Sequence, residues 1–319
     1  MTGSDRPEAP RAGRLLVVAT PLGNLSDITL RAVEALRAAD LVVCEDTRRT
    51  RGLLSHLGIA TPLRSHHKFN EAAGVSALVE LLAGGRCLTL VSDAGTPGLS
   101  DPGARLVRAA RAAGHSVEPI PGPSAPAAAI SAAGFEAAGY LFAGYPPASA
   151  AARRQFFEGL RAMESARAAA DRKAGPCPIV FFEAPHRIVA SLVGMIEVLG
   201  DRPAVLFREM TKLHEEGIAG SLAEILERLK GSQVRGEITL VVEGGGADAR
   251  PQEPIGQAAL GDRYRRLIEA GAPRKEALRK LSSLTGLSRR QLYRELFLED
   301  SAGAPSPAGE GGGDGEGEG

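Results

Sequence analysis

Cysteine is scarce in this 319-residue sequence, which contains only Cys44, Cys87 and Cys177. The three lie in or beside apolar runs, are odd in number and form no C-x-x-C pair. This usage predicts free thiols in a reducing compartment. Neither the cysteines nor the six scattered histidines have metal-ligand spacing, so we expect no bound metal.

Long apolar runs are missing as well. No uninterrupted span reaches membrane length, and residues 1–12 are polar and contain proline instead of leading from basic residues into an apolar core. We therefore expect a cytoplasmic protein that does not contact a membrane.

Two phosphate-binding signatures are absent. The sequence has no G-x-x-x-x-G-K-[ST], and residues 19–24, after the first predicted strand, do not read G-x-G-x-x-G. A nucleoside triphosphate or dinucleotide is therefore disfavoured. Glycine-rich loops without a phosphate lysine suit a ligand with ribose and adenine but no pyrophosphate, and S-adenosylmethionine is one such ligand.

The net charge of zero hides a segregation of charge. Residues 299–319 carry six acids and no base, which leaves residues 1–298 with 38 basic against 32 acidic side chains. Residues 260–298 account for this excess, with ten Lys or Arg and four Asp or Glu. Such clustering indicates an anionic partner.

Apolar periodicity predicts an α/β fold. In the first 120 residues, strands at 15–18, 41–44, 88–91 and 116–120 alternate with a helix capped at Ser26 or Asp27 and ending at Ala39, and with another at 104–113. This repeat implies a parallel sheet covered on both faces. A Pro-Gly-Pro-Ser break precedes a helix at 125–133, for which Ser124 is the predicted N-cap.

The second half repeats the α/β pattern and ends in helices. Strands are predicted at 178–182, 204–207 and 238–242, and helices at 188–199 and 222–229, while residues 148–175 look helical and exposed. A helical pattern begins at Tyr264, continues through 281, turns at 285–287 and resumes at 288–293, the spacing of a helix-turn-helix. The predicted organisation is a disordered tail at 1–12, α/β domains at 13–120 and 121–246, a linker at 247–258, a basic helix-turn-helix-like module at 259–298 and a disordered acidic tail at 299–319.

Residues 92–103, Ser-Asp-Ala-Gly-Thr-Pro-Gly-Leu-Ser-Asp-Pro-Gly, form a wide predicted loop between a strand and a helix. Glycine, proline and short polar side chains let such a loop wrap a ligand closely. Loops at the carboxyl ends of parallel strands line the ligand crevice of an α/β sheet. An ordinary turn-rich connection is the alternative.

Seven blocks carry a resemblance to a known family, in the expected order along residues 14–298: 19–29, 44–48, 92–103, 121–125, 182–187, 208–212 and 236–241. They closely resemble the 16S rRNA cytidine 2'-O-methyltransferases, ribosomal small-subunit methyltransferase I, of the tetrapyrrole-methylase-like superfamily. Two positions depart from that pattern: Phe69 stands where a second polar residue is common, and Tyr145 where leucine is usual.

The resemblance implies two α/β domains of the tetrapyrrole methylase type, with S-adenosylmethionine in the cleft between them, and a homodimer. The residues that it places at the cofactor are Leu22, Asp93, Ala94, Gly95, Thr96, Leu99, Ser100, Ser124, Ala125, Glu183, Ala184, Met210, Glu237, Ile238 and Thr239. Leu22, Leu99 and Met210 are also ordinary core residue types.

Methyl transfer to a ribose hydroxyl needs aligned reactants and removal of the hydroxyl proton. Charged side chains in the matching blocks are the catalytic candidates. The candidate bases are Glu45, Asp46, Glu183 and Glu209, and the candidates for stabilising negative charge or holding RNA are Arg48, Arg208 and Lys212. The same charges can also form structural ion pairs with one another, so the sequence assigns no base.

The partner implied by the resemblance is 16S rRNA in the small ribosomal subunit, and not DNA. The candidate RNA contacts are His67, Lys68, His186, Arg187, Arg279, Arg289 and Arg290. A solvated basic helix face is the alternative explanation for the last three.

We therefore expect an enzyme that transfers a methyl group from S-adenosylmethionine to the 2'-oxygen of a cytidine in 16S rRNA. Two alternatives stay open: a methyltransferase of the same fold acting on a tetrapyrrole or diphthine-type acceptor, and a noncatalytic RNA-binding factor. The basic C-terminal module argues against a small macrocyclic acceptor.

Overall fold

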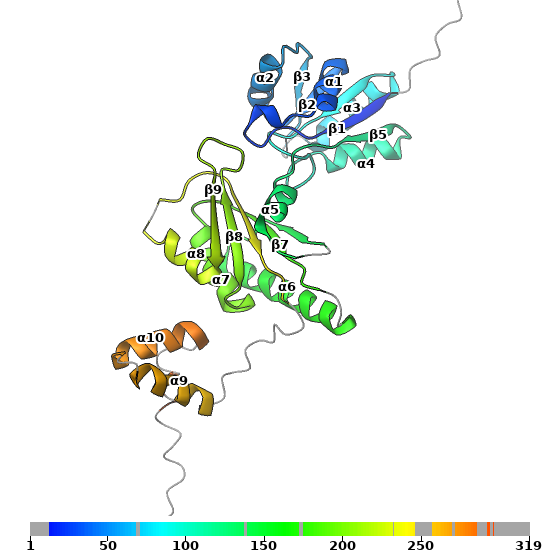
Figure 1. Cartoon of the computed structure of the whole chain (residues 1–319). Coiled ribbons are helices and arrows are strands. Elements are labelled where there is room, and N and C mark those ends of the chain that lie inside the picture. The colour runs from blue at the N-terminus through cyan, green and yellow to red at the C-terminus, as the bar shows by residue number, and fades with distance from the viewer. Residues whose placement is uncertain are drawn as a thin grey trace, which may run out of the picture. The chain divides into compact units, whose positions relative to one another are not determined.

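The computed structural model describes residues 13–67, 71–136, 139–171, 175–231, 233–245, 257–269, 272–285, 292–293 and 296. By their contacts, the residues form two compact units, Met1–Asp248 and Ala249–Gly319. The first unit contains two five-stranded sheets, drawn in blue to cyan and in green to yellow in Figure 1.

The first sheet has the strand order β3-β2-β4-β1-β5, and all four pairs are parallel. Its strands are β1 (Arg14–Val18), β2 (Leu41–Cys44), β3 (Leu63–Ser65), β4 (Cys87–Leu90) and β5 (Ser116–Ile120). The elements between them are η1 (Leu25–Asp27), α1 (Leu30–Ala38), α2 (Thr47–His56), α3 (Glu71–Ala83) and α4 (Ala104–Ala112).

Side-chain alternation along β1 shows how this sheet is covered. Leu16 and Val18 pack with buried residues of α1 and α2, whereas Leu15 and Val17 pack with those of α3 and α4. Successive residues of a strand point to opposite faces, so both faces are apolar. The predicted parallel sheet with two covered faces is confirmed.

The second sheet has the order β6-β7-β10-β8-β9 and is mixed. Its strands are β6 (Leu141–Gly144), β7 (Ile179–Glu183), β8 (Pro203–Arg208), β9 (Glu216–Ser221) and β10 (Ile238–Val242). Its helices are α5 (Ala125–Ala133), α6 (Ala150–Ala170), α7 (Ile188–Leu199) and α8 (Leu222–Leu229). Because β10 runs antiparallel to both β7 and β8, its first residues lie beside the last residues of those strands.

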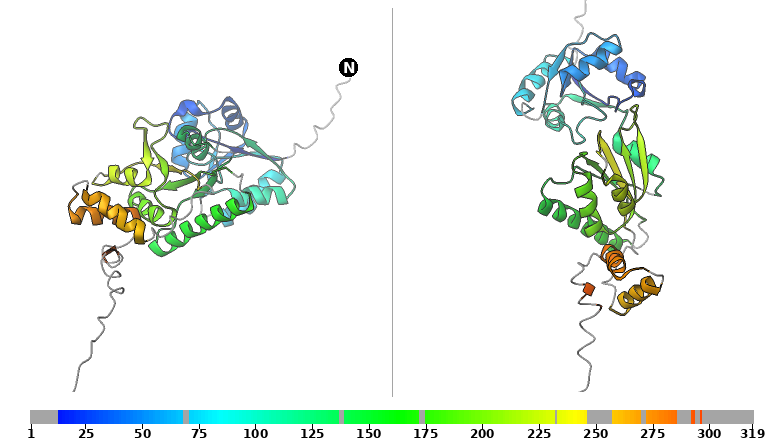
Figure 2. Two further views of the ribbon diagram at one scale, coloured as in Figure 1. Left: turned by 60° about the horizontal axis from the view of Figure 1, so that its bottom comes forward. Right: turned by 90° about the vertical axis from the view of Figure 1, so that its left-hand side faces the viewer.

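Helices cover the two faces of the second sheet unequally. Residues of α6, α7 and α8 pack together over one face, around Phe181 and Leu206, whereas α5 packs on the other through Ala129. Figures 1 and 2 show this arrangement, with α5 apart from the other three helices.

Most predicted elements are confirmed, and several end within one residue of their predicted bounds. The predicted cap at Ser26 or Asp27 is wrong. Ser26 and Asp27 belong to η1, and α1 begins after Thr29, whose Oγ1 accepts a hydrogen bond from Ala32 N at 3.2 Å. Ser124 is the N-cap residue of α5 as predicted, although its side chain forms no capping bond.

The second unit contains α9 (Gln257–Glu269) and α10 (Arg274–Thr285). Leu260, Leu281 and Leu292 form its small core. The continuous helical pattern predicted from Tyr264 through 281 is therefore wrong, since two helices span this segment and Pro273 precedes α10. Proline lacks the N–H that an uninterrupted helix needs at that point.

The structure tests the membrane prediction only for the residues it describes. Within them, no helix combines the length and the apolar character needed to cross a bilayer. The domain boundaries predicted above stay predictions.

A matched pair of leucine substitutions tests the core of the second sheet. Leu206 is 0% exposed on β8, and Leu213 is 93% exposed. We expect Leu206→Ala to lower the free energy of unfolding by about 2–5 kcal/mol, because it removes packed methyl groups and leaves a cavity. Leu213→Ala should change it by less than about 0.5 kcal/mol. Urea unfolding measures both, and equal losses would contradict this core.

Candidate active site

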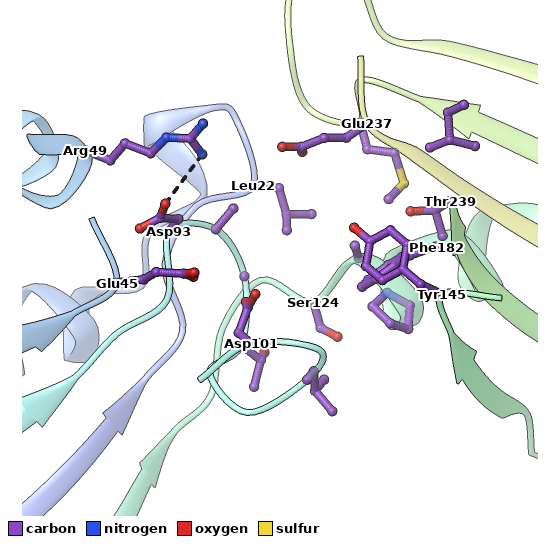
Figure 3. Close-up of a pocket in the computed structure, with 18 of the residues that line it drawn as sticks. Leu22, Glu45, Arg49, Asp93, Asp101, Ser124, Tyr145, Phe182, Glu237 and Thr239 are labelled. Atoms are coloured by element: carbon purple, nitrogen blue, oxygen red, sulfur yellow. Dashed lines mark ion pairs between the residues drawn. The ribbon is translucent and has the colours of Figure 1, made fainter. Parts of the chain in front are cut away.

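A cavity of about 360 Å³ lies where loops of the first sheet meet the second sheet (Figure 3). Its walls come from residues that follow β1, β2, β4 and β5, from the first turn of α5, and from the second sheet. The lining residues are Leu22, Glu45, Asp46, Arg49, Asp93, Ala94, Gly95, Thr96, Leu99, Asp101, Ser124, Ala125, Pro126, Tyr145, Phe182, Met210, Glu237, Ile238 and Thr239. The carboxyl ends of parallel strands thus form one side, as expected for a ligand site in an α/β sheet.

Backbone hydrogen bonds pin the first loop to the long loop. Thr20 N donates to Gly95 O at 2.9 Å, and Gly95 N donates to Thr20 O at 3.0 Å. Gly95 has a φ of +74°, and a Cβ there would lie 3.0 Å from Leu22 Cδ2. Glycine therefore allows Leu22 and the long loop to approach each other closely.

Asp93 links the N-terminal end of α2 to the long loop at residues 92–103. Its Oδ1 accepts a hydrogen bond from Asp46 N at 2.9 Å, and its Oδ2 lies 3.7 Å from Arg49 Nη1, the ion pair marked in Figure 3. Asp93 therefore shapes the wall formed by residues 45–49, in addition to lining the cavity.

The cavity is strongly acidic, since five carboxylates and one arginine line it. Burial, together with the nearby carboxylates of Glu45 and Asp93, raises the pKa of Asp101 to about 6. Burial and Asp93 also raise the pKa of Glu45. In contrast, hydrogen bonds from the Arg48 side chain and backbone lower the pKa of Asp46 to about 2. Glu45 and Asp101 are thus the stronger bases, and the site favours a positively charged ligand group.

Glu209 organises the wall at the second sheet. Its Oε1 accepts hydrogen bonds from Glu237 N at 2.8 Å and Lys212 Nζ at 2.9 Å, and these bonds lower its pKa. Gly236 has a φ of +86°, and a Cβ there would lie 2.4 Å from Glu209 Cγ. Thr211 Oγ1 accepts from Asn24 N at 3.1 Å, which ties this wall to the first loop.

Glu183 lies behind the cavity, 3% exposed, and does not line it. Its carboxylate accepts hydrogen bonds from Ser191 Oγ and from Ala184 N, and its Oε1 lies 3.2 Å from Arg187 Nε. Arg187 also donates to Pro146 O. These contacts give the pair a structural position next to the chain that follows β6.

The structure brings most of the predicted cofactor residues together. All of them line the cavity except Ser100, Glu183 and Ala184. Leu22, Leu99 and Met210 all line it, and none is fully buried, although Met210 also packs against the core cluster around Ala129.

The predicted catalytic residues divide into two groups. Glu45 and Asp46 line the cavity. The others form ion pairs beside it: Arg48 with Asp46 at 2.7 Å, Arg208 with Glu216 at 2.8 Å, and Lys212 with Glu209 at 2.9 Å and Glu237 at 3.2 Å. The catalytic roles of all six residues stay predictions.

The predicted RNA contacts are only partly described. His67 is half-buried, and His186 is exposed in the turn between β7 and α7. Lys68, Arg289 and Arg290 lie outside the described residues, as does the side chain of Arg279.

Sequence reasoning missed several lining residues: Arg49, Asp101, Pro126, Tyr145 and Phe182. Asp101 could have been predicted from the sequence, because it belongs to the polar loop at 92–103. Pro126 and Phe182 adjoin predicted positions. No sequence feature indicated Arg49 or Tyr145 as lining residues. The position of Arg49 depends on where α2 starts, and that of Tyr145 on an irregularity in β6.

Comparison with known proteins gives the family. Residues 14–226 match the family described as Tetrapyrrole (Corrin/Porphyrin) Methylases. The chain belongs to this tetrapyrrole methylase family. Its members use S-adenosylmethionine as the methyl donor.

Close relatives narrow the group. The chain is 40% identical over 300 residues to "Ribosomal RNA small subunit methyltransferase I" of Mesorhizobium japonicum, covering 93% of this chain and 96% of the relative. It is 42% identical over 287 residues to the protein of the same name from Pseudomonas aeruginosa, covering 89% and 96%. The resemblance described above is confirmed by these matches.

Solved structures support the fold alone. A cobalt precorrin-4 methyltransferase of cobalamin biosynthesis aligns with a TM-score of 0.52 at 18% identity, covering 75% of this chain and 96% of that chain. A diphthine synthase aligns with a TM-score of 0.51 at 16% identity, covering 72% and 89%.

The residues present fit the family's donor. S-adenosylmethionine combines an adenosine with a positively charged sulfur and an amino-acid group. The cavity offers apolar surface from Leu22, Met210 and Ile238, carboxylates for positive charge, and a volume within the usual range of small-molecule sites. Among the residues that the structure describes, no lysine lines it, in agreement with a ligand that has no phosphate.

A pair of glycine substitutions tests the wall organised by Glu209. Gly236→Ala places a Cβ in the Glu209 side chain, whereas Gly231, with a φ of +77°, has no atom within 4 Å of such a Cβ. Both variants should lose about 1 kcal/mol of stability from the left-handed backbone. Only Gly236→Ala should weaken S-adenosylmethionine binding, by at least about fivefold (about 1 kcal/mol) in calorimetric titration. Equal affinities would show that Glu209 does not shape the site.

The pKa of Asp101 gives a pH test. A folded-state pKa of about 6, above the ordinary value near 3.9, means that the folded protein binds this proton more tightly than the unfolded chain. The contribution of Asp101 to stability therefore falls as the pH rises from about 4 to about 6. Asp101→Asn cannot ionise, so it should gain stability relative to the parent protein between pH 4 and pH 7. Urea unfolding at both pH values measures this, and a constant difference would refute the shift.

Proposed function

We propose that this protein transfers a methyl group from S-adenosylmethionine to the 2'-oxygen of a cytidine in 16S rRNA of the small ribosomal subunit. The observation that carries the proposal is the acidic cavity at the carboxyl ends of β1, β2 and β4, closed by the start of β10. Relatives that are about 40% identical over nearly the whole chain support ribosomal RNA as the acceptor. Such a substrate places the protein in the cytoplasm.

Within the cavity, S-adenosylmethionine supplies a methyl group on a positively charged sulfur. Asp93 holds residues 45–49 in place through its bonds to Asp46 N and Arg49. Glu45 has a raised pKa and lines the same cavity, so we assign it the acceptance of the proton from the ribose 2'-hydroxyl. Asp46 is a poorer candidate, because Arg48 lowers its pKa to about 2.

The exposed basic residues of the second unit support contact with RNA. Arg265 and Arg266 lie on α9, and Arg274 and Lys275 lie at the start of α10, all on the surface of that unit. Exposed cations neutralise phosphates without reading sequence, so this module would dock the RNA and leave the choice of nucleotide to the cavity. We also propose a homodimer, as in the family resemblance.

One assay tests this proposal against its alternatives. The protein is incubated with methyl-labelled S-adenosylmethionine and small subunits that lack the modification, and the label is mapped by nuclease resistance of the methylated ribose. We expect label on one cytidine 2'-oxygen. Label on a nucleobase, or transfer to a tetrapyrrole or diphthine-type acceptor alone, would refute the proposal, and failure to bind S-adenosylmethionine would favour a noncatalytic RNA-binding factor.

Asp93→Ala tests the site within the same assay. Loss of a charged hydrogen-bond partner costs about 1.5–3 kcal/mol, so we expect S-adenosylmethionine to bind about tenfold to hundredfold more weakly. Asp27→Ala is the matched control, because Asp27 is exposed in η1 and outside the cavity lining. Calorimetric titration measures both, and equal affinities would remove Asp93 from the site.

A further inference from the structure

Tyr145 is an exposed aromatic residue in the wall of the cavity. It is 54% exposed, and a second aromatic residue of the lining, Phe182, is half-buried beside it. The two ring centroids are 5.5 Å apart, and Phe182 in turn contacts Phe142 at 4.9 Å. Packing therefore backs one side of the Tyr145 ring and leaves the rest open to the cavity, as Figure 3 shows.

An irregularity in β6 brings Tyr145 to this side of the sheet. Leu141 and Ala143 pack with the core under α6, α7 and α8, whereas Phe142 packs on the opposite face. Regular alternation would turn Tyr145 to the face of Leu141 and Ala143. The register shifts between Phe142 and Gly144, where Gly144 has a φ of +67°, and Tyr145 instead joins Phe142 beside Phe182.

A buried ion pair fixes the chain just after Tyr145. Pro146 O accepts a hydrogen bond from Arg187, and Arg187 is paired with the buried carboxylate of Glu183. Glu183 and Arg187 are thus positioning residues for Tyr145. An exposed ring with a fixed backbone and a fixed neighbour is preorganised to receive a flat ligand.

We propose that Tyr145 is the stacking platform for the pyrimidine base of the acceptor nucleotide, and this inference rests on the proposed function. Unstacked bases of RNA are commonly received on aromatic side chains. The carboxylates of Asp101 and Glu237 also line the cavity, and carboxylates accept hydrogen bonds from the exocyclic amine of cytosine. The donor's adenine fits the less exposed apolar wall of Leu22, Met210 and Ile238, whereas a polynucleotide can reach the exposed ring.

Tyr145→Leu tests the platform, because leucine keeps apolar bulk and removes the aromatic face. Leucine is the usual residue here in the resembling family, so the platform is proposed for this chain and not for the family. We expect kcat/KM for small subunits to fall about tenfold to hundredfold, or about 1.4–2.8 kcal/mol, with the Kd for S-adenosylmethionine within about twofold of the parent value. Tyr145→Phe keeps the aromatic face and should retain most of the parent kcat/KM. Tyr140→Leu is the matched control, since Tyr140 is 41% exposed just before β6 and does not line the cavity; its kcat/KM should stay within about twofold.

The outcomes separate this inference from the proposed function. If the parent protein methylates no ribose, the proposed function fails. If it does and Tyr145→Leu leaves kcat/KM unchanged, the ring is no platform. If Tyr145→Leu weakens S-adenosylmethionine binding tenfold or more, the ring receives the donor's adenine and the inference is overturned. Small subunits with uridine at the target position should react at least tenfold more slowly, and equal rates would contradict the contact to the amine.

Discussion

The site depends on holding several carboxylates close together in a partly buried cavity. Burial, together with repulsion among the carboxylates of Glu45, Asp93 and Asp101, raises the pKa values of Glu45 and Asp101. Contacts of Asp93 offset part of this cost. Asp93 accepts a backbone N–H and faces Arg49. Without a cationic ligand, this arrangement stores unfavourable electrostatic energy, which a ligand with a positively charged centre relieves. The electrostatic feature that is unfavourable by itself thus favours a ligand with a positive charge.

Apolar runs in the sequence predicted the parallel first sheet because its inner strands β1, β2 and β4 bury side chains on both faces. The edge strand β9 was missed, since its sequence Glu-Gly-Ile-Ala-Gly-Ser has a single buried hydrophobic residue, Ile218. The helix α2 was missed for a related reason: its first turn is Thr-Arg-Arg-Thr, with little apolar periodicity. Both elements depend on tertiary contacts rather than on local pattern.

The cavity could be predicted mainly through the family resemblance, which named Leu22, Asp93 and Met210, three residues that the structure brings to its wall. Charge type alone could not separate ligand contacts from structural pairs. Glu183 and Arg208 have the chemistry of catalytic groups, yet one is buried behind the wall and the other pairs with Glu216 across two strands. Such pairings join residues from different elements, and no spacing within one block reveals them.

The pair of Glu183 and Arg187 has an evolutionary consequence. It supports the chain that carries Tyr145 while remaining behind the cavity wall. On the role proposed for Tyr145, substitutions at these two positions would change the preference for the acceptor without altering any group that touches it. In relatives that act on a different acceptor, we therefore expect substitutions at these two positions behind the wall as well as among the lining residues.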